Sequence, residues 1–221
     1  METPIEKKLS DEGQIGIAKL QDSCIEAIYS VDPSAVLHGG TAIWRCYSGN
    51  RFSDDIDIYL RTNKEINEIR NKLTFAMNRR DATITKSAVI GNYSIFTVEG
   101  GEAEIKLEMG KNMDGIRPVE RNYEKVNGTY ISILTLTPED FIIEKVQTYK
   151  SRKYVRDLYD IYHLSASIPQ TSQCAKVICS FLKAIQKPVD ENALKSIVYA
   201  GAAPSFDGMV DAIRGRFCEV H

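Results

Sequence analysis

The stretch that decides the fold is residues 38–60, HGGTAIWRCYSGNRFSDDIDIYL. It begins with two glycines that follow a short apolar run, and it ends with two aspartates set two residues apart in another apolar run. Alternate side chains of a strand share a face, so Asp55 and Asp57 present two carboxylates on one side. Two neighbouring carboxylates repel each other unless a cation lies between them. The stretch therefore predicts a strand, a turn at the glycines, a short helix and then a second strand, and this second strand carries a cation site.

The chemistry expected of this stretch involves phosphates. Mg²⁺ takes oxygen ligands and commonly combines one or two carboxylates with substrate phosphates. Glycines where a strand meets a helix let backbone N–H groups approach an anion closely. We expect phosphates on Gly39, Gly40 and Thr41, and two Mg²⁺ ions on Asp55 and Asp57, as in two-metal phosphoryl or nucleotidyl transfer. Each motif alone is common in turns and strand edges, and the conjunction of the two within twenty residues is what points to function.

Composition sets bounds on the class of protein. The chain has 221 residues, of which 43% are hydrophobic and 26% charged, as in soluble globular proteins. The net charge of −2 gives no overall attraction to nucleic acid or anionic membrane. No apolar run approaches the roughly 18 residues of a membrane span. Five scattered cysteines without a Cys-x-x-Cys pair predict neither a zinc site nor a disulfide framework, and together with the polar N-terminus they favour a cytoplasmic location.

Two regions differ in the periodicity of their apolar residues. Residues 10–30 show helical spacing, with Ser10 as the expected N-cap, and residues 63–80 predict a second helix. The apolar stripe expected for that second helix consists of Ile66, Ile69, Leu73, Phe75 and Met77. Residues 81–90, 92–100, 102–110 and 129–136 are β-rich runs separated by Gly-Asn, Gly-Gly and Asn-Gly. Residues 1–135 therefore predict an α/β domain with a mixed, partly antiparallel sheet.

A helix boundary follows at residues 136–141, LTPEDF. Thr137 suits the N-cap, Pro138 the first turn, and the acidic residues after it the positive end of a helix. From there the pattern is helical to the end, punctuated by prolines. We therefore predict an α+β chain with domains at 1–135 and 136–221.

Two motifs resemble a known family. The glycines followed by Asp-Ile-Asp resemble the DNA polymerase β-like nucleotidyltransferase superfamily. More narrowly, residues 38–60 are similar to the Gly-Gly-Thr-Ala…Arg-x-Ser-x-Asp-x-Asp motif of the AbiEii/AbiGii-type nucleotidyltransferase toxins. Residues 144–164, EKVQTYKSRKYVRDLYDIYHL, resemble the second hallmark of that family, a helical Lys followed by Arg and then Arg-Asp-x-Tyr-Asp. The resemblance covers roughly residues 35–165, and the loop at 46–52 is one residue longer than is usual in the family.

A third carboxylate usually completes such a metal site and lies on a later strand. Glu104, Lys106 and Glu108 share one face of the run at 102–110. The resemblance places a Lys-x-acidic element here, which makes Glu108 the expected third metal ligand and Glu104 the alternative. An exposed polar strand face would show the same pattern.

The second motif supplies further candidates. The resemblance implies that Lys145 contacts the phosphates of the nucleotide and that Asp157 is essential. Arg152 and Arg156 are expected to bind triphosphate or an RNA backbone. Arg51 and Ser53 belong to the first motif, where they flank the metal pair, and are expected to contact the γ-phosphate. An ordinary ion-pair network with a surface lysine would give the same spacing.

The resemblance implies a domain at 1–135 that acts as an Mg²⁺-dependent nucleotidyltransferase. It would move NMP from an NTP to an acceptor hydroxyl, with the tRNA 3′ end as one acceptor, and act as a toxin with a separately encoded antitoxin. The alternatives are a catalytically inactive fold used for NTP binding or interaction, a phosphotransferase, and an RNA-binding protein without chemistry. The intact carboxylate pair argues against the inactive fold, and the slightly acidic net charge argues against simple RNA binding.

Overall fold

The computed structural model describes residues 3–61, 65–111, 115 and 117–218. The chain forms two compact units, Met1–Ser48 with Phe52–Thr135, and Gly49–Arg51 with Leu136–His221. The short segment Gly49–Arg51 therefore groups with the second unit. The predicted division at residue 135 assigned this segment to the first domain. Each unit is described separately below.

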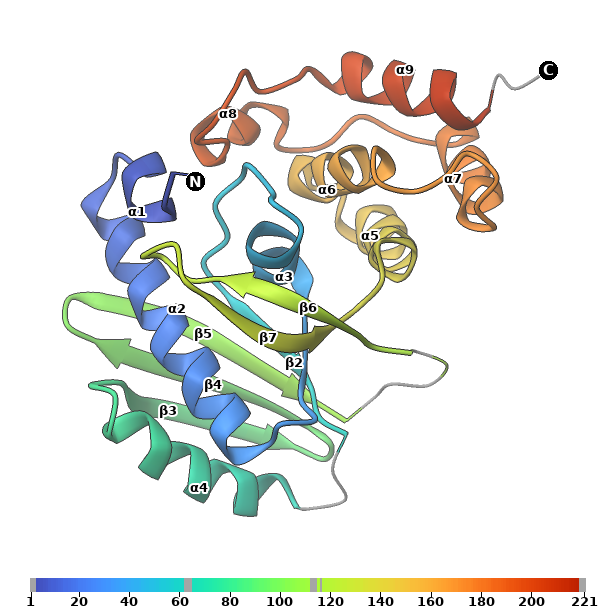
Figure 1. Cartoon of the computed structure of the whole chain (residues 1–221). Coiled ribbons are helices and arrows are strands. Elements are labelled where there is room, and N and C mark those ends of the chain that lie inside the picture. Colours follow the sequence, from blue (N-terminus) through green and yellow to red (C-terminus); the bar gives the residue numbers. More distant parts are fainter. Residues whose placement is uncertain (1–2, 62–64, 112–114, 116, 219–221) are drawn as a thin grey trace. The chain divides into compact units, whose positions relative to one another are not determined.

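The first unit is built on a seven-stranded sheet in the order β3-β4-β5-β2-β1-β7-β6 (Figure 1). Its strands are β1 (Val36–His38), β2 (Ile56–Tyr59), β3 (Thr83–Ile90), β4 (Tyr93–Gly100), β5 (Ala103–Gly110), β6 (Val119–Glu124) and β7 (Tyr130–Thr135). Pairing is parallel for β2–β5 and β1–β7 and antiparallel for the other neighbours, so the sheet is mixed as predicted. Strand β6 was not predicted, because its sequence VERNYE carries little apolar alternation.

The four helices of the first unit are α1 (Ile5–Lys8), α2 (Glu12–Val31), α3 (Gly39–Cys46) and α4 (Ile66–Asn78). The long helix α2 packs on β5, α4 packs on β3, and the two helices contact each other (Figure 1). Ile56, Ile58 and Leu107 are fully buried, whereas Glu104 and Lys106 are exposed. One face of this part of the sheet therefore forms the core, and the other carries polar residues.

Two details of these helices correct the sequence predictions. The side chain of Asp11, not Ser10, accepts a hydrogen bond from the backbone N–H of Gln14 and caps α2. In α4 the buried stripe contains Ile66, Leu73 and Met77, but Phe75 is 66% exposed. Phe75 follows Ile66 by about two and a half helical turns, which places it on the opposite side of the helix. Residues 63 and 64 of the predicted helix lie outside the described residues.

A buried ionic cluster joins α2, α3 and β6. Arg45 on α3 forms an ion pair with Asp22 on α2, and the Tyr123 hydroxyl on β6 donates to the same carboxylate at 3.0 Å. The backbone N–H of Val126 donates to the other Asp22 oxygen at 2.8 Å. The Arg45 guanidinium also lies 4.8 Å from the centroid of the Tyr123 ring. These contacts fix the position of α3, the helix that begins at the predicted phosphate-binding glycines.

The second unit is helical. Its elements are α5 (Pro138–Arg152), α6 (Val155–Ser165), α7 (Cys174–Lys183), a 3-10 turn η1 (Glu191–Ala193), α8 (Leu194–Ile197) and α9 (Phe206–Phe217). The predicted cap is confirmed, since the Thr137 hydroxyl accepts from the backbone N–H of Asp140 at 3.1 Å. Lys153 has the left-handed φ of 55° and ends α5, so Arg152 and Arg156 lie on different helices. Within the described residues no helix is long and apolar enough to cross a membrane.

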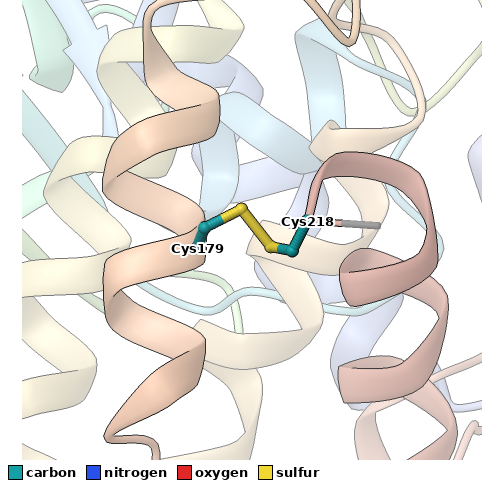
Figure 2. Close-up of a disulfide and its surroundings, with 2 residues drawn as sticks. All are labelled: Cys179 and Cys218. Atoms are coloured by element: carbon teal, nitrogen blue, oxygen red, sulfur yellow. A yellow bond between two sulfur atoms is a disulfide. The ribbon is translucent and has the colours of Figure 1, made fainter. Parts of the chain in front are cut away.

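A disulfide joins Cys179 of α7 to Cys218, the residue that directly follows α9 (Figure 2). Their Cα atoms are 5.6 Å apart across 39 positions of sequence. The cysteine spacing was predicted to give no disulfide framework, and this single bond was not predicted. Cysteine spacing indicates a bond only in recognised frameworks, and packing of α9 on α7 is what brings these two thiols together.

Candidate active site

The first functional segment is the junction of β1 and α3. Gly39 directly follows β1 and has a φ of +71°, which L side chains rarely adopt. A Cβ on Gly39 would overlap the Asp57 carboxylate, coming within 2.8 Å of its Cγ. Glycine is thus required here for two reasons, its backbone angle and the close approach of the Asp57 carboxylate to the start of α3.

Asp57 and Glu108 are direct neighbours across the sheet. In the parallel pairing of β2 with β5, Asp57 is the register partner of Glu108, and on its other side it pairs with His38. Asp55 is the residue before β2, so alternation continued one step back puts it on the side of Asp57. Glu104 lies four residues before Glu108 and pairs instead with Glu99 on β4. The register thus brings Glu108, rather than Glu104, to Asp57.

The Glu108 carboxylate is held by two side chains from its own side of the sheet. The Tyr93 hydroxyl donates to Oε2, and the Lys106 ammonium forms an ion pair with Oε1. Charge-assisted contacts of this kind are among the stronger hydrogen bonds in proteins. They fix the rotamer of Glu108 and offset its charge beside Asp57.

Asp57 and Glu108 line a cavity of about 690 Å³ in the first unit, and Asp55 is not among the lining residues. The cavity is lined by His38, Asp57, Ile58, Tyr59, Asn92, Tyr93, Glu108, Gly110 and Lys111. The rings of His38 and Tyr59 stack with centroids 3.7 Å apart and form one wall. The cavity combines anionic ligand atoms, an amide, a lysine and aromatic surface, a lining suited to a polar, phosphorylated ligand with a planar group.

The loop before β2 is tied down from α2 and α3. The Thr41 hydroxyl donates to the backbone carbonyl of Asp55 at 2.5 Å, and the Gln21 amide donates to the carbonyl of Ser53 at 2.8 Å. Thr41 is completely buried and Ser53 nearly so. The Thr41 side chain therefore positions the Asp55 segment.

The candidates of the second unit form a buried ionic network. Lys145 Nζ lies 2.9 Å from Asp160 Oδ2 and 3.5 Å from Asp157 Oδ1. Arg51 binds both Asp160 oxygens, at 2.6 and 2.7 Å, and Arg152 binds both Asp157 oxygens at 2.7 Å. Lys145 therefore contacts Asp160 more closely than Asp157, the aspartate expected from the second motif.

The charges of this network are mutually dependent. Burial alone would raise the pKa of Asp160, but Arg51 and Lys145 outweigh it and hold that pKa below the ordinary value. The hydrogen bonds to Asp157 raise the pKa of Arg152. The guanidinium groups of Arg152 and of Arg156 on α6 lie 5.2 and 5.6 Å from the ring centroid of Tyr154. Lys145 is only 4% exposed, so the snorkelling surface lysine of the simpler interpretation does not describe it.

The carboxylates of this site are suited to an Mg²⁺ ion that also binds oxygens of a substrate phosphate. Among the described residues, no three Asp, Glu, His or Cys side chains gather into a complete metal cluster. Mg²⁺ needs no such cage, because it keeps waters and uses one or two carboxylates plus substrate oxygens. Asp57 and Glu108, adjacent in register and open to a cavity, supply that kind of donor set.

Sequence reasoning missed Tyr93 and the stacked His38–Tyr59 pair as lining residues of this cavity. The Gly-Gly pair at 100–101 held the signal for Tyr93. The hairpin that it predicts between β4 and β5 pairs Tyr93 with Gly110 and Ile95 with Glu108, which puts the tyrosine on the Glu108 side of the sheet.

Comparisons with known proteins identify a matching family and two structures of similar fold. The model of a family described as nucleotidyl transferase AbiEii toxin, type IV TA system, matches residues 27–216. No curated protein matches the chain. The crystal structure of JHP933 from Helicobacter pylori is similar with a TM-score of 0.62 and 18% identity, covering 93% of this chain and 90% of that one. A structure of a proposed nucleotidyltransferase from H. pylori gives a TM-score of 0.61 at 18% identity and covers 94% of each chain. At this identity the two structures show the fold.

Proposed function

Because the chain belongs to the AbiEii family of nucleotidyltransferase toxins of type IV toxin–antitoxin systems, we propose that it transfers NMP from an NTP to an acceptor hydroxyl. The observation that carries the proposal is the register of Asp57 and Glu108, adjacent to each other beside the glycine start of α3. Family membership makes the chain a nucleotidyltransferase, and the choice of NTP, acceptor and residues is our proposal.

The phosphates are held at the start of α3. The first N–H groups of a helix have no partner within the helix and carry partial positive charge, so they attract a phosphate. Gly39 and Gly40 admit the triphosphate, and Thr41 contributes its backbone N–H while its hydroxyl anchors the Asp55 loop. Asp55, Asp57 and Glu108 would hold two Mg²⁺ ions, which when bound screen the triphosphate and lower the pKa of the attacking hydroxyl.

In the reaction the acceptor oxygen attacks the α-phosphorus, the bond from that phosphorus to the bridging oxygen breaks, and pyrophosphate leaves. The acceptor loses its proton to solvent. We propose Lys145, Arg152 and Arg156 as the cations of the second unit that would offset negative charge on phosphates. Arg51 acts as the anchor of Asp160, because both oxygens of that carboxylate bind its guanidinium. Ser53 belongs to the loop that sets the position of Asp55.

We propose the tRNA 3′ end as acceptor, a separately encoded antitoxin as regulator and the cytoplasm as the site of action. Family membership in a toxin–antitoxin system supports the antitoxin. RNA ends and NTPs meet in the cytoplasm, which supports the location.

The test is incubation of the protein with Mg²⁺ and each NTP, labelled at the α- or the γ-phosphate, in the presence of total RNA or total protein. Transfer of the α-label to RNA, with release of pyrophosphate and loss in Asp57→Asn, supports the proposal. Transfer of the γ-label would instead identify a phosphotransferase. Absence of both, with NTP binding retained, would identify an inactive NTP-binding module.

A further inference from the structure

A second hollow of the first unit lies between α4 and the end of α2, which contact each other (Figure 1). Its volume is about 910 Å³. Its lining, here called the α2–α4 groove, consists of Ser30, Val31, Asn71, Lys72, Phe75, Ala76, Arg79 and Arg80. None of these residues belongs to the candidate active site.

Phe75 is the central feature of the α2–α4 groove. It is 66% exposed on the side of α4 that faces away from the buried stripe. The Arg79 guanidinium, one helical turn on, lies 5.9 Å from the centroid of its ring. An exposed ring with a guanidinium beside it is a platform on which an unpaired base stacks, and such stacking is tolerant of base identity.

The lining of the groove is also cationic. It includes Lys72, Arg79 and Arg80 and no carboxylate. Lys72 is half-exposed and contacts Glu68 at 2.8 Å. Arg80 lies 3.6 Å from Glu26, a carboxylate that Lys125 also contacts at 2.6 Å. The described lining therefore carries three cations, two of which contact carboxylates outside the lining, and in a chain of net charge −2 the groove is a local positive site.

We propose that the α2–α4 groove binds single-stranded nucleic acid, with a base on Phe75 and phosphates beside Arg79, Lys72 and Arg80. A protein partner fits less well, because interface cores are apolar and poor in charge, whereas Phe75 is surrounded by cations and an amide. This inference rests on the proposed function, in which the single-stranded nucleic acid is the RNA acceptor. Binding at the groove nevertheless needs neither NTP nor metal, so it is tested apart from the chemistry.

The experiment measures fluorescence anisotropy of a labelled single-stranded oligoribonucleotide in EDTA, without NTP, over a range of salt concentrations. Phe75→Ala should weaken binding about tenfold or more, and Phe75→Trp should retain it. Arg79→Glu should weaken binding and reduce the slope of log affinity against log salt. The control is Arg70→Glu, which changes the net charge equally on the same helix but outside the groove lining. A duplex of the same sequence should bind more weakly, because its bases are not free to stack.

Equal losses in Arg79→Glu and Arg70→Glu would overturn the proposal, since they would indicate attraction by net charge alone. An unchanged affinity in Phe75→Ala, or equal competition by polyglutamate, would also overturn it and identify a general anion surface. Circular dichroism of each variant verifies folding. A wild-type protein that binds NTP but not the oligoribonucleotide would contradict the groove proposal alone. A wild-type protein that binds the oligoribonucleotide but transfers no NMP would contradict the proposed function alone.

Discussion

Gly39 is the residue whose replacement is easiest to interpret. Alanine there would have an unfavourable φ of +71° and would push the Asp57 carboxylate away. We expect Gly39→Ala to abolish nucleotidyl transfer and to lower the free energy of unfolding by about 1–3 kcal/mol. The matched control is Gly101→Ala, which has a φ of +59° but open space around its Cβ. Equal loss of transfer in the two variants would show that the contact with Asp57 has no role.

Tyr93 acts on the site through Glu108. In Tyr93→Phe the Glu108 carboxylate loses a hydrogen-bond donor but keeps Lys106. We expect the Mg²⁺ concentration for half-maximal transfer to change severalfold while the melting temperature stays nearly constant. Steady-state rates over a Mg²⁺ series measure this. The control Tyr162→Phe removes a hydroxyl of the second unit, and an identical response in both variants would contradict the positioning role.

Asp160 makes the free energy of unfolding of the second unit depend on pH in the acidic range. Its pKa is lower in the folded chain than the ordinary value of 3.8, so folding favours its ionised form. The resulting stabilisation is fully present above about pH 4 and is lost as pH falls through the lower, folded-state pKa. Asp160→Asn should cost about 3–5 kcal/mol at pH 7, because Arg51 and Lys145 stay buried without this partner.

Denaturant unfolding between pH 7 and pH 2 measures this effect. The variant should also lose part of the acid dependence of the wild type. Asp211→Asn, which breaks the surface pair with Arg214, is the control and should differ little from wild type. An Asp160→Asn variant with the stability and acid profile of wild type would contradict the argument.

At the scale of elements, the buried cluster of Asp22, Arg45 and Tyr123 holds two helices on the sheet. Arg45→Met should destabilise the protein by about 3–5 kcal/mol, because Asp22 is left buried without its cation. The double variant Asp22→Asn/Arg45→Met should recover part of that loss, which equilibrium unfolding of all four proteins in a mutant cycle would show. Strictly additive effects would mean that the ion pair contributes nothing of its own.

Periodicity predicted elements where local pattern and packing agree. The helix at residues 10–30, the cap at Thr137 and the hairpin strands β3, β4 and β5 follow from spacing within a few residues. Strand β6 was missed because it takes its pairing from β7 rather than from an apolar pattern of its own. The prediction for Phe75 was wrong because this residue lies on the side of α4 opposite Ile66, away from the buried stripe.

The candidate site was predicted in part. Alternation sufficed to put Asp55 and Asp57 together and Glu104 with Glu108. It could not select Glu108 as the neighbour of Asp57, because the parallel pairing of β2 with β5 joins residues about fifty positions apart. The ion pair of Arg51 with Asp160 could not be predicted either, because the segment Gly49–Arg51 groups with residues more than eighty positions later in the chain.

At the scale of the whole molecule, the bond between Cys179 and Cys218 closes a loop of 39 positions that contains α8 and α9. Loop-closure entropy for this length corresponds to about 4 kcal/mol, so Cys179→Ser or reduction should lower the free energy of unfolding by up to that amount. Denaturant unfolding with and without reductant measures it. Cys174→Ser replaces a thiol outside the bond and should abolish none of the reductant effect. Identical stability of the oxidised and reduced protein would contradict the prediction.

The pairing of β2 with β5 also limits which changes of chain length this protein can accept. One residue added within β5 ahead of Leu107 would exchange the two faces of the strand beyond it, so that the Glu108 carboxylate would enter the apolar core and Leu107 would leave it. Two added residues would restore the original faces. We therefore expect natural relatives to contain insertions of an even number of residues in β5 and none of an odd number. The turn at residues 101–102, between β4 and β5, should accept insertions of either kind.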